Sequence, residues 1–463
     1  MNGEWVRSQG SGEVEVINPA TEEVLYAVPR GVADDVDKAA TAAANAFEAW
    51  STTTNQDRAA VLAKVARLIE ERAEEITDLI VREVGHPRSA AAAAQTGGAV
   101  EELDLMVSAL SEIAWIEKVG TATVRRVPAG VVAAITPWNS PLRAITIKAG
   151  AAIAAGCTVV VKGSEIAPFA AYLFAELTAE AGLPPGVFNM VSGTGPEMGE
   201  SLVDHPAVDM VSLTGSVRAG RRVMELAARS IKRVQLELGG NSPNLILEGT
   251  DLERAIIGGI EDSFRNAGQV CGALTRLFVP RDRLSEAEEI AAHKAESFVL
   301  GDPFDPATTL GPVKTATQRE RVRALIGAGI AEGARLLTGG PDPPAGLDRG
   351  YFVQPTVLVA DNTMSIAREE IFGPVLSLIP FDDVAHAVTM ANDSPYGLAG
   401  AVWAGDPDLA RAVASRLRTG RVRINGAPLD KRAPHGGFKR SGIGREWGRY
   451  GIEGFLEYQS LIG

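Results

Sequence analysis

Four short apolar segments, separated by helical patterns, constrain the fold of this chain more than any other feature. Each is a nearly continuous run of apolar residues, as in strands that are buried on both faces. Helical repeats at residues 144–155 and 167–181 separate the first three segments. Strands that alternate with helices predict an α/β fold with a doubly wound parallel sheet. The four segments are residues 131–135, 158–161, 187–191 and 208–213.

The remaining chain divides into further units. Residues 13–30 are expected to form two short strands around a turn, and residues 34–116 have a helical pattern. A second α/β pattern starts after Gly239, at residues 244–279. Strand-like residues 120–127 and 451–463 are expected to pair with each other or with another subunit. The expected domains are a cofactor-binding domain (1–109 and 129–238), a catalytic domain (239–440) and a small β oligomerisation segment (110–128 and 441–463).

Charge and cysteine content exclude several classes of protein. The 463 residues include 45 basic and 58 acidic side chains, and the net charge of −13 argues against nucleic acid as a partner. No run of about eighteen apolar residues predicts a membrane span, and no secretory leader is recognisable. Two cysteines do not make a disulfide framework, so a reducing compartment, the cytoplasm, is expected. The five histidines lack metal-ligand spacing, so no metal site is expected.

Cys271 is the first candidate for catalysis. It lies in the segment Gly268-Gln-Val-Cys271-Gly272, and glycines allow the close approach of backbone to a ligand. Cysteine attacks as the thiolate, so a nucleophilic cysteine needs a cation or a base nearby. The alternative for an isolated cysteine is a small buried apolar residue.

Polar residues follow several of the predicted strands. Asn139 follows the first strand, where its amide can donate to an oxyanion together with the Cys271 N–H, or where it simply forms a turn. Lys162 and Glu165 suit the hydroxyls of a nucleotide ribose, with a surface ion pair as the alternative. Glu237 ends an apolar alternation, so it is either a general base or an ion-pair partner.

Two glycine-containing stretches are candidates for binding a pyrophosphate. Gly193-Thr-Gly195-Pro-Glu-Met-Gly199 misses the G-x-G-x-x-G spacing by one residue and contains a proline, so it is a weak dinucleotide motif. Thr214-Gly215-Ser216 leads from a predicted strand into a helix that starts near Val217. Its N–H groups and the Ser216 hydroxyl are therefore expected at a helix N-terminus that can bind a pyrophosphate.

Taken together, these motifs resemble the aldehyde dehydrogenase superfamily in order and in spacing, from about Asn18 to the C-terminus. The motifs are Pro137-Trp-Asn139, Lys162-Gly-Ser-Glu165, Leu213-Thr-Gly-Ser216, Glu237-Leu-Gly-Gly, Gly268-Gln-Val-Cys271, Glu369-Glu-Ile-Phe-Gly-Pro374 and Gly436-Gly-Phe-Lys-Arg-Ser-Gly-Ile-Gly-Arg-Glu446.

The resemblance implies a role for each motif. Cys271 is implied as the nucleophile, Glu237 as the base for deacylation, and Asn139 as an oxyanion donor. Lys148 and Glu446 are implied as secondary proton-relay residues. The implied cofactor is NAD, with NADP as the alternative because Glu165 is able to turn away from a 2′-phosphate. The implied cofactor-binding residues are Thr136, Trp138, Lys162, Ser164, Glu165, Gly195, Gly199, Thr214, Gly215, Ser216, Leu238, Glu370 and Phe372.

Departures from the family pattern concern the substrate. Small residues where the family often has bulky ones predict a wide tunnel and a bulky aldehyde, either aromatic, terpenoid or ring-bearing. Lys431 and Arg432 suggest a semialdehyde acid as the alternative. A coenzyme-A-acylating relative is disfavoured by Glu237, and a non-catalytic binding protein by the retained Cys271. The resemblance also implies a homodimer or homotetramer. The tunnel residues considered are Ser140, Arg143, Ala144, Ile147 and Gly272.

Overall fold

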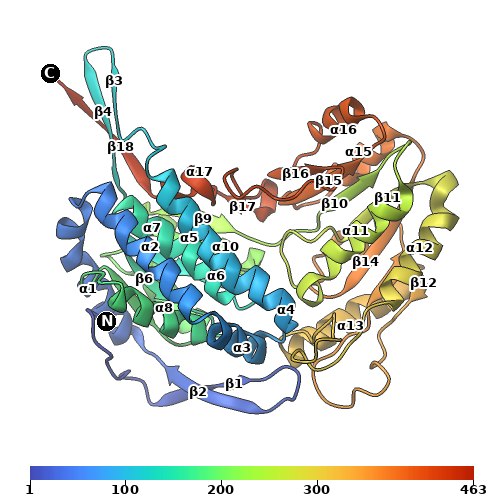
Figure 1. Cartoon of the computed structure of the whole chain (residues 1–463), viewed down its shortest axis with the longest axis horizontal. Coiled ribbons are helices and arrows are strands. Elements are labelled where there is room, and N and C mark those ends of the chain that lie inside the picture. Colours follow the sequence, from blue (N-terminus) through green and yellow to red (C-terminus); the bar gives the residue numbers. More distant parts are fainter.

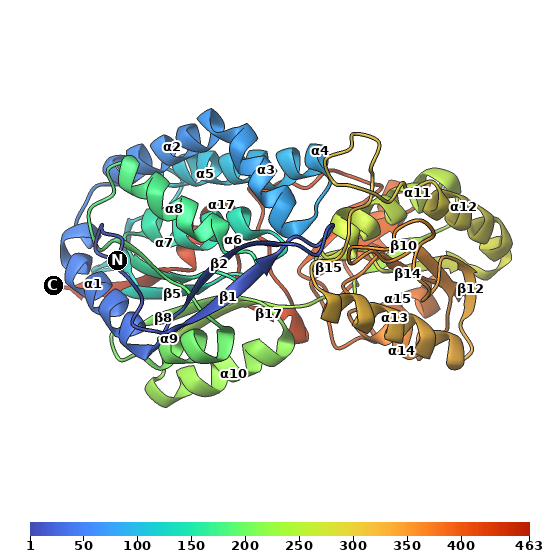
Figure 2. The same ribbon diagram turned by 90° about the horizontal axis from the view of Figure 1, so that it is seen from below.

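The computed structural model describes all residues, 1–463. Each half of the molecule is built around one large sheet (Figures 1 and 2). The first sheet has six strands in the order β17–β9–β8–β5–β6–β7, and all of its pairs are parallel except that of β17 with β9. The chain runs outward from β5 to β7 and then returns to β8 and β9, so the strand order reverses between β5 and β8. The strands are β5 Val131–Ile135, β6 Thr158–Lys162, β7 Phe188–Val191, β8 Met210–Thr214, β9 Arg233–Glu237 and β17 Gly442–Ile443.

Helices cover both faces of this sheet, as a doubly wound fold requires (Figure 2). One face carries a core of 44 buried residues, to which α2, α3, α5 and α8 contribute, and the other packs against α1, α9 and α10. The helices are α1 Ala33–Ser51, α2 Asn55–Glu71, α3 Ala73–Val84, α4 Arg88–Ala91, α5 Gly98–Ala109, α6 Pro141–Ile145, α7 Ala151–Ala155, α8 Phe169–Glu180, α9 Glu200–Asp204 and α10 Val217–Ala227. No helix of the structure combines the length and the apolar character needed to cross a bilayer.

The second sheet has seven strands in the order β12–β13–β14–β11–β10–β15–β16, and only β12 pairs antiparallel. The chain crosses from the first sheet to the second between Glu237 and Pro243. Its strands are β10 Pro243–Ile246, β11 Arg276–Pro280, β12 Arg335–Thr338, β13 Thr356–Val359, β14 Val375–Phe381, β15 Ala399–Trp403 and β16 Arg421–Ile424. Its helices are α11 Leu252–Phe264, α12 Leu284–Glu296, α13 Ala316–Ala331, α14 Ser365–Arg368, α15 Val384–Asn392 and α16 Pro407–Ala414.

A three-stranded antiparallel sheet projects from the body and carries the C-terminus (Figure 1). Its edge strand β18 pairs along its whole length with β4, from Leu456 opposite Pro128 to Ile462 opposite Ala122. The predicted pairing between residues 120–127 and the C-terminal segment is therefore present in the fold. The strands of this sheet are β3 Ile116–Val119, β4 Ala122–Pro128 and β18 Leu456–Ile462, and a separate hairpin joins β1 Gly12–Ile17 to β2 Val24–Arg30.

The main departures from the predicted elements are local. The expected helix at residues 144–155 is divided by a π-helical turn, a form that is frequent at functional sites. The expected strand at residues 451–463 begins instead as helix α17, Gly448–Glu453, because Ile452 is buried against α5 and α7. The π-helical turns are η1 Ala92–Gly97, η2 Thr146–Gly150 and η3 Gly195–Gly199, and 3₁₀ turns lie at Ala228–Ser230, Arg265–Gly268, Arg281–Arg283 and Lys439–Ser441.

Candidate active site

The loop that presents Cys271 runs from the end of α11 to the start of β11. Asn266, Ala267 and Gly268 take left-handed conformations in succession, with φ of 50°, 52° and 74°. A Cβ at Gly268 would lie 1.9 Å from the carbonyl oxygen of Gly373, so the position requires glycine. Non-glycine residues with positive φ are strained, and such strain clusters at active sites. The backbone that leads to Cys271 therefore has a fixed and uncommon shape.

Cys271 is partly exposed as a residue, whereas its thiol is surrounded by protein. Burial raises the pKa of this thiol to about 11, the guanidinium of Arg421 opposes the shift, and the carboxylate of Glu237 adds to it. The backbone N–H of Cys271 donates to no protein group. A partly exposed cysteine with a cation nearby and a free N–H has the arrangement that a thiolate nucleophile uses.

Asn139 is held next to this loop by hydrogen bonds. Its side-chain amide donates to the carbonyl of Gln269 at 2.8 Å, two residues before Cys271. Its backbone carbonyl accepts from the side chains of Gln95 and Asn266, both at 3.1 Å. An amide has two N–H donors, and the second N–H of Asn139 has no protein acceptor. The structure thus places Asn139 against the loop of Cys271, and the Asn139 amide and the Cys271 N–H each have one free donor.

Glu237 ends strand β9, and only 3% of its side chain is exposed. Neither of its carboxylate oxygens accepts a hydrogen bond. Burial raises the pKa of Glu237 well above its ordinary value, the neighbouring charge of Glu446 raises it further, and Lys148 opposes the shift. A buried carboxylate with free lone pairs and a raised pKa is suited to accept a proton near neutral pH.

Lys148 and Glu446 form a buried ion pair, although 298 residues separate them in the sequence. The Lys148 ammonium lies in η2 and donates to Glu446 at 2.7 Å and to the hydroxyl of Ser212 at 3.1 Å. Their side chains are 1% and 8% exposed. The two residues expected to relay protons are therefore in contact, and Glu446 is close enough to Glu237 to affect its pKa.

Several of the predicted cofactor-binding residues lie at the carboxyl ends of β5, β6 and β8. Lys162 donates to Glu165 at 2.6 Å, and the Ser216 hydroxyl caps α10 by accepting from the Ala219 N–H at 3.2 Å. The buried hydroxyl of Thr136 has no partner. Ligands of doubly wound sheets bind where the strand order reverses, which is the gap between β5 and β8. An orphaned hydroxyl and a helix N-terminus at this point, with a carboxylate after the neighbouring strand β6, fit a dinucleotide. Residues at or next to these strand ends include Thr136, Trp138, Lys162, Ser164, Glu165, Thr214, Gly215 and Ser216.

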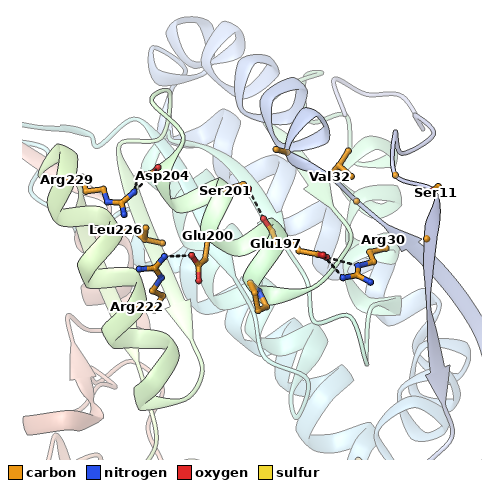
Figure 3. Close-up of a pocket in the computed structure, with 15 residues that line it drawn as sticks. Ser11, Arg30, Val32, Glu197, Glu200, Ser201, Asp204, Arg222, Leu226 and Arg229 are labelled. Carbon is orange, nitrogen blue, oxygen red and sulfur yellow. Dashed lines mark hydrogen bonds and ion pairs between the residues drawn. The ribbon is translucent and has the colours of Figure 1, made fainter.

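Gly195 and Gly199 begin and end the π-helical turn η3 beside α10. A Cβ at Gly195 would meet nothing, and one at Gly199 would only touch Ile135, so neither position requires glycine for space. A cavity of about 760 Å³ lies between this segment and α10 (Figure 3). Its cations are matched by acids, because Arg222 contacts Glu200, Arg30 contacts Glu197, and Arg229 contacts Asp204. The cavity therefore offers no unpaired cation for a phosphate.

Glu370 and Phe372 approach the end of β9 from the second sheet. The Glu370 carboxylate accepts from the Gly240 N–H at 3.0 Å, and a Cβ at Gly239 would lie 2.0 Å from it. Burial raises the pKa of Glu370 to about 7. Phe372 has a left-handed φ of 58°, and its ring meets Trp138 edge-on at 5.5 Å. The structure thus places Glu370 beside the end of β9 and Phe372 beside Trp138.

Leu238, the last of the predicted cofactor-binding residues, is packed into the protein. It is buried, and its side chain lies against the backbone of Gly220 in α10, where a Cβ would be 2.6 Å from it. Its backbone N–H donates to the carbonyl of Ser441 at 2.9 Å. These contacts fix the backbone that follows Glu237.

Sequence reasoning missed three residues that contribute to the site. Arg421 comes from β16, and its guanidinium makes one hydrogen bond, to His435 at 3.2 Å. The His435 ring stacks on Trp447 at 4.5 Å, and Arg421 lies over the same indole at 5.2 Å. Trp447 is buried with a strained φ of 73°. The alternation Arg421-Val-Arg423 on a strand was a signal, because it places two cations on one face.

The expectation that Gly272 leaves open space before the thiol is wrong. The Nη2 atom of Arg421 lies 2.6 Å from the place where a Cβ of residue 272 would be. Glycine at this position therefore makes room for the guanidinium. Ser140, also expected to widen the tunnel, accepts a hydrogen bond from Gln95 at 3.1 Å, and Ala144 and Ile147 are buried.

Lys431 and Arg432 are both paired with acids. Lys431 contacts Glu101 and lies 3.8 Å from Glu102, a carboxylate that also binds Arg143 at 3.0 Å. Arg432 is largely exposed and binds Asp430 at 2.6 Å. Their charges are already balanced within the chain, which weakens their expected role in holding a substrate carboxylate.

Comparison with known proteins places this site in a family. The aldehyde dehydrogenase family model matches residues 5–461. The 3-succinoylsemialdehyde-pyridine dehydrogenase of a Pseudomonas species is 48% identical, over all of this chain and 98% of that protein. A variant of aldehyde dehydrogenase C from Pseudomonas syringae, solved with NAD+ and octanal, has a TM-score of 0.99 at 47% identity and covers 100% of this chain and 96% of its own.

A third similar protein is an aldehyde dehydrogenase from Mycobacterium tuberculosis, solved with NAD+. It has a TM-score of 0.97 at 41% identity, covering 100% of this chain and 97% of that one. These likenesses extend over the whole chain and agree with the α/β architecture and with the motifs of the candidate site. The chain belongs to the aldehyde dehydrogenase family.

Proposed function

We propose that the chain oxidises an aldehyde to its carboxylic acid with NAD through a covalent intermediate on Cys271. The observation that carries the proposal is that Asn139 binds the loop of Cys271 and that Glu237 lies close enough to raise the pKa of the thiol, although the three residues come from separate segments. A thiol, a proton acceptor and amide donors are the groups that acyl transfer through cysteine requires. Membership of the aldehyde dehydrogenase family supports the same chemistry.

The first half of the reaction forms a bond between Cys271 and the substrate. The thiolate adds to the aldehyde carbon, and the electron pair of the carbonyl bond moves to oxygen. The side-chain amide of Asn139 and the Cys271 N–H stabilise this oxyanion. Bound NAD supplies a hydride acceptor at nicotinamide C4. Loss of hydride from the carbon restores the carbonyl and leaves a thioester on Cys271.

The second half returns the enzyme to its starting state. Glu237 removes a proton from a water molecule, whose oxygen forms a bond to the thioester carbon. The carbon–sulfur bond breaks, the Cys271 thiolate leaves, and the acid is released. The raised pKa of Glu237 matches its basicity to this task. Lys148 and Glu446 then provide a route along which the proton leaves Glu237.

NAD is the proposed cofactor, and two observations support it. The Lys162–Glu165 pair sets a carboxylate where the ribose hydroxyls are expected, and a 2′-phosphate would be repelled there. Similar proteins were solved with NAD+. In the proposed site Ser216 and the N-terminus of α10 hold the pyrophosphate, and Glu370 and Phe372 orient the nicotinamide end.

The proposed substrate is a bulky aldehyde, with a ring or a long chain. One similar enzyme is named for a semialdehyde that bears a pyridine ring, and another was solved with octanal. Acid release from octanal or benzaldehyde, with NADH formation and without added coenzyme A or phosphate, tests the proposal. A kcat/KM for acetaldehyde above both values contradicts it.

A semialdehyde that bears a carboxylate is the second candidate, and Arg421 favours it. No carboxylate binds this guanidinium, and a buried cation without an anionic partner suits an anionic ligand. If Arg421 binds the substrate carboxylate, Arg421→Met lowers the ratio of kcat/KM for succinic semialdehyde to that for octanal by about tenfold. If this ratio is unchanged, Arg421 does not bind the substrate carboxylate. Any effect of the substitution on the reactivity of the Cys271 thiol is common to both substrates and therefore cancels in the ratio.

We also propose that residues 110–128 and 441–463 mediate assembly into a homodimer or homotetramer. The edge strand β18 exposes Tyr458, Leu461 and Ile462, and exposed strand edges with apolar side chains favour pairing with another chain. Residues 442–443 are an exception within this segment, because they pair with β9. Light scattering of an Ile462→Glu variant, compared with the parent protein, tests the assembly.

A further inference from the structure

His435 is held rigidly beside Glu237. Its backbone exchanges two hydrogen bonds with Glu446, at 2.8 Å and 2.7 Å, which fixes the main chain. Its ring lies on Trp447 with an interplanar angle of 21°, and only 9% of the side chain is exposed. Because both the backbone of His435 and the face of its ring are held, the two ring nitrogens point in fixed directions.

Arg421 decides which of these nitrogens carries the proton. Its Nη1 lies 3.2 Å from Nδ1 of His435, and a guanidinium only donates, so Nδ1 is the acceptor. A neutral imidazole whose Nδ1 accepts has its hydrogen on Nε2. Burial and the surrounding cations lower the pKa of His435 well below its ordinary value, so the ring is neutral at physiological pH. The cations are Arg421, Arg143, Lys148 and Arg445.

The Nε2 atom of His435 faces the proposed base. It lies 3.6 Å from Oε2 of Glu237, longer than the roughly 2.7–3.2 Å of a formed N–H···O bond. Neither oxygen of Glu237 has another partner. A Cβ at Gly436 would lie 2.9 Å from Oε1, so glycine next to His435 leaves the carboxylate room to turn. A small rotation of the Glu237 side chain closes the bond.

We propose that His435 is a positioning residue for Glu237, with Arg421 fixing its tautomer and its Nε2–H directing the carboxylate toward the deacylating water. This inference rests on the proposed function, because it assigns a partner to the proposed base. His435 does not replace Glu237, since a nitrogen that already carries hydrogen accepts no proton. Its donor stabilises the carboxylate form, which opposes the effects of burial and of Glu446.

The test compares two substitutions that treat the ring differently. His435→Phe keeps an aromatic face for Trp447 but removes the donor, whereas His435→Gln keeps an N–H donor. His386→Phe, at a partly exposed histidine in the second α/β unit, is the control. Rapid-mixing measurements follow the NADH burst with octanal, and kcat is recorded from about pH 5 to 10. The charged groups near Glu237 that affect the profile are Glu446, Lys148, Arg445 and Arg421.

For His435→Phe we expect a burst close to that of the parent protein and a kcat at pH 7 lowered about tenfold. Loss of a donor to the charged form raises the pKa of Glu237, so the acidic limb of kcat moves to higher pH by about one unit. His435→Gln should recover part of this shift, and His386→Phe should show none.

Three results would overturn the inference. The first is an unchanged acidic limb in His435→Phe, and the second is an equal loss of burst and kcat in both variants, which indicates a packing role. The third is the absence of recovery in a folded His435→Gln variant, checked by its melting temperature. The proposed function fails separately, when the parent protein makes no NADH with any aldehyde or when Glu237→Gln deacylates at the parent rate.

Discussion

Cys157 and Cys271 have the same raised thiol pKa, about 11, but lie in very different surroundings. Cys157 is fully buried in the large core, where its thiol donates to the carbonyl of Phe455 at 3.5 Å. Cys271 is partly exposed, with a cation, a carboxylate and free N–H donors around it. The pKa alone therefore does not separate a structural cysteine from a nucleophile, whereas access and neighbours do.

The largest contrast is expected from removing each thiol. Cys271→Ala should lower kcat by at least about 10³-fold, because no other group forms the thioester. Cys157→Ala should keep kcat within about twofold and lower the free energy of unfolding by about 1 kcal/mol through a small cavity. NADH formation and urea unfolding measure the two effects. Equal losses of activity in both variants would remove the distinction.

Glu237→Gln removes a carboxylate that lies near Cys271 and has no counterpart near Cys157. Steady-state kcat should fall about 10²–10³-fold, since water loses its proton acceptor, while the NADH burst of about one equivalent per site remains. Rapid mixing with an aldehyde separates the two phases. If the burst and the steady-state rate fall together, Glu237 acts before deacylation.

A glycine with positive φ lies close to each cysteine. Replacing each of them with alanine compares how strongly stability and activity depend on the two backbone segments. Gly156 has a φ of 90° and Gly268 one of 74°, so both changes should destabilise the fold by about 1–3 kcal/mol. Gly268→Ala also pushes against the carbonyl of Gly373, so kcat should fall about tenfold or more, whereas Gly156→Ala should barely affect it. Melting temperatures and kcat are the measurements. A loss of activity only in Gly156→Ala would contradict this view of the loop.

The smallest expected effect concerns the pKa of the Cys271 thiol. The Arg421 guanidinium favours the thiolate, so Arg421→Met should raise the pKa of Cys271 further and slow its alkylation by iodoacetamide severalfold at a fixed pH near 9. Alkylation should follow the thiolate fraction, with the rate rising through the pKa as pH increases. Mass spectrometry distinguishes the two cysteines, and Cys157 should stay unmodified in the folded protein. A faster reaction in Arg421→Met would show that Arg421 shields the thiol instead.

The sequence predicted the parts of the site that follow from local order. Asn139 and Glu237 lie at strand ends, and the carboxyl ends of parallel strands share one edge, so their meeting was predictable. Gly268 was expected to let the backbone approach a ligand, whereas in the structure it makes room for the carbonyl of Gly373. These inferences used only the strand pattern and the chemistry of single residues.

The parts that escaped prediction depend on segments that meet only in three dimensions. Arg421, His435 and Trp447 come from the last tenth of the chain and contact one another through a return of the backbone after β16. A missing side chain at Gly272 indicated space, but the sequence does not say which neighbour fills it. The π-helical turn that carries Lys148 has no sequence pattern that distinguishes it from an α-helix.

The pairing of β17 with β9 has a consequence for the order in which the protein is completed during synthesis. All seven strands of the second sheet lie between residues 243 and 424, so this unit can close as soon as that stretch leaves the ribosome. The six-stranded sheet begins earlier but receives its final strand only at residues 442–443. Chains stalled before that point would therefore contain Cys271 and Glu237 without Glu446, with a bare edge on β9 for chaperones to cover.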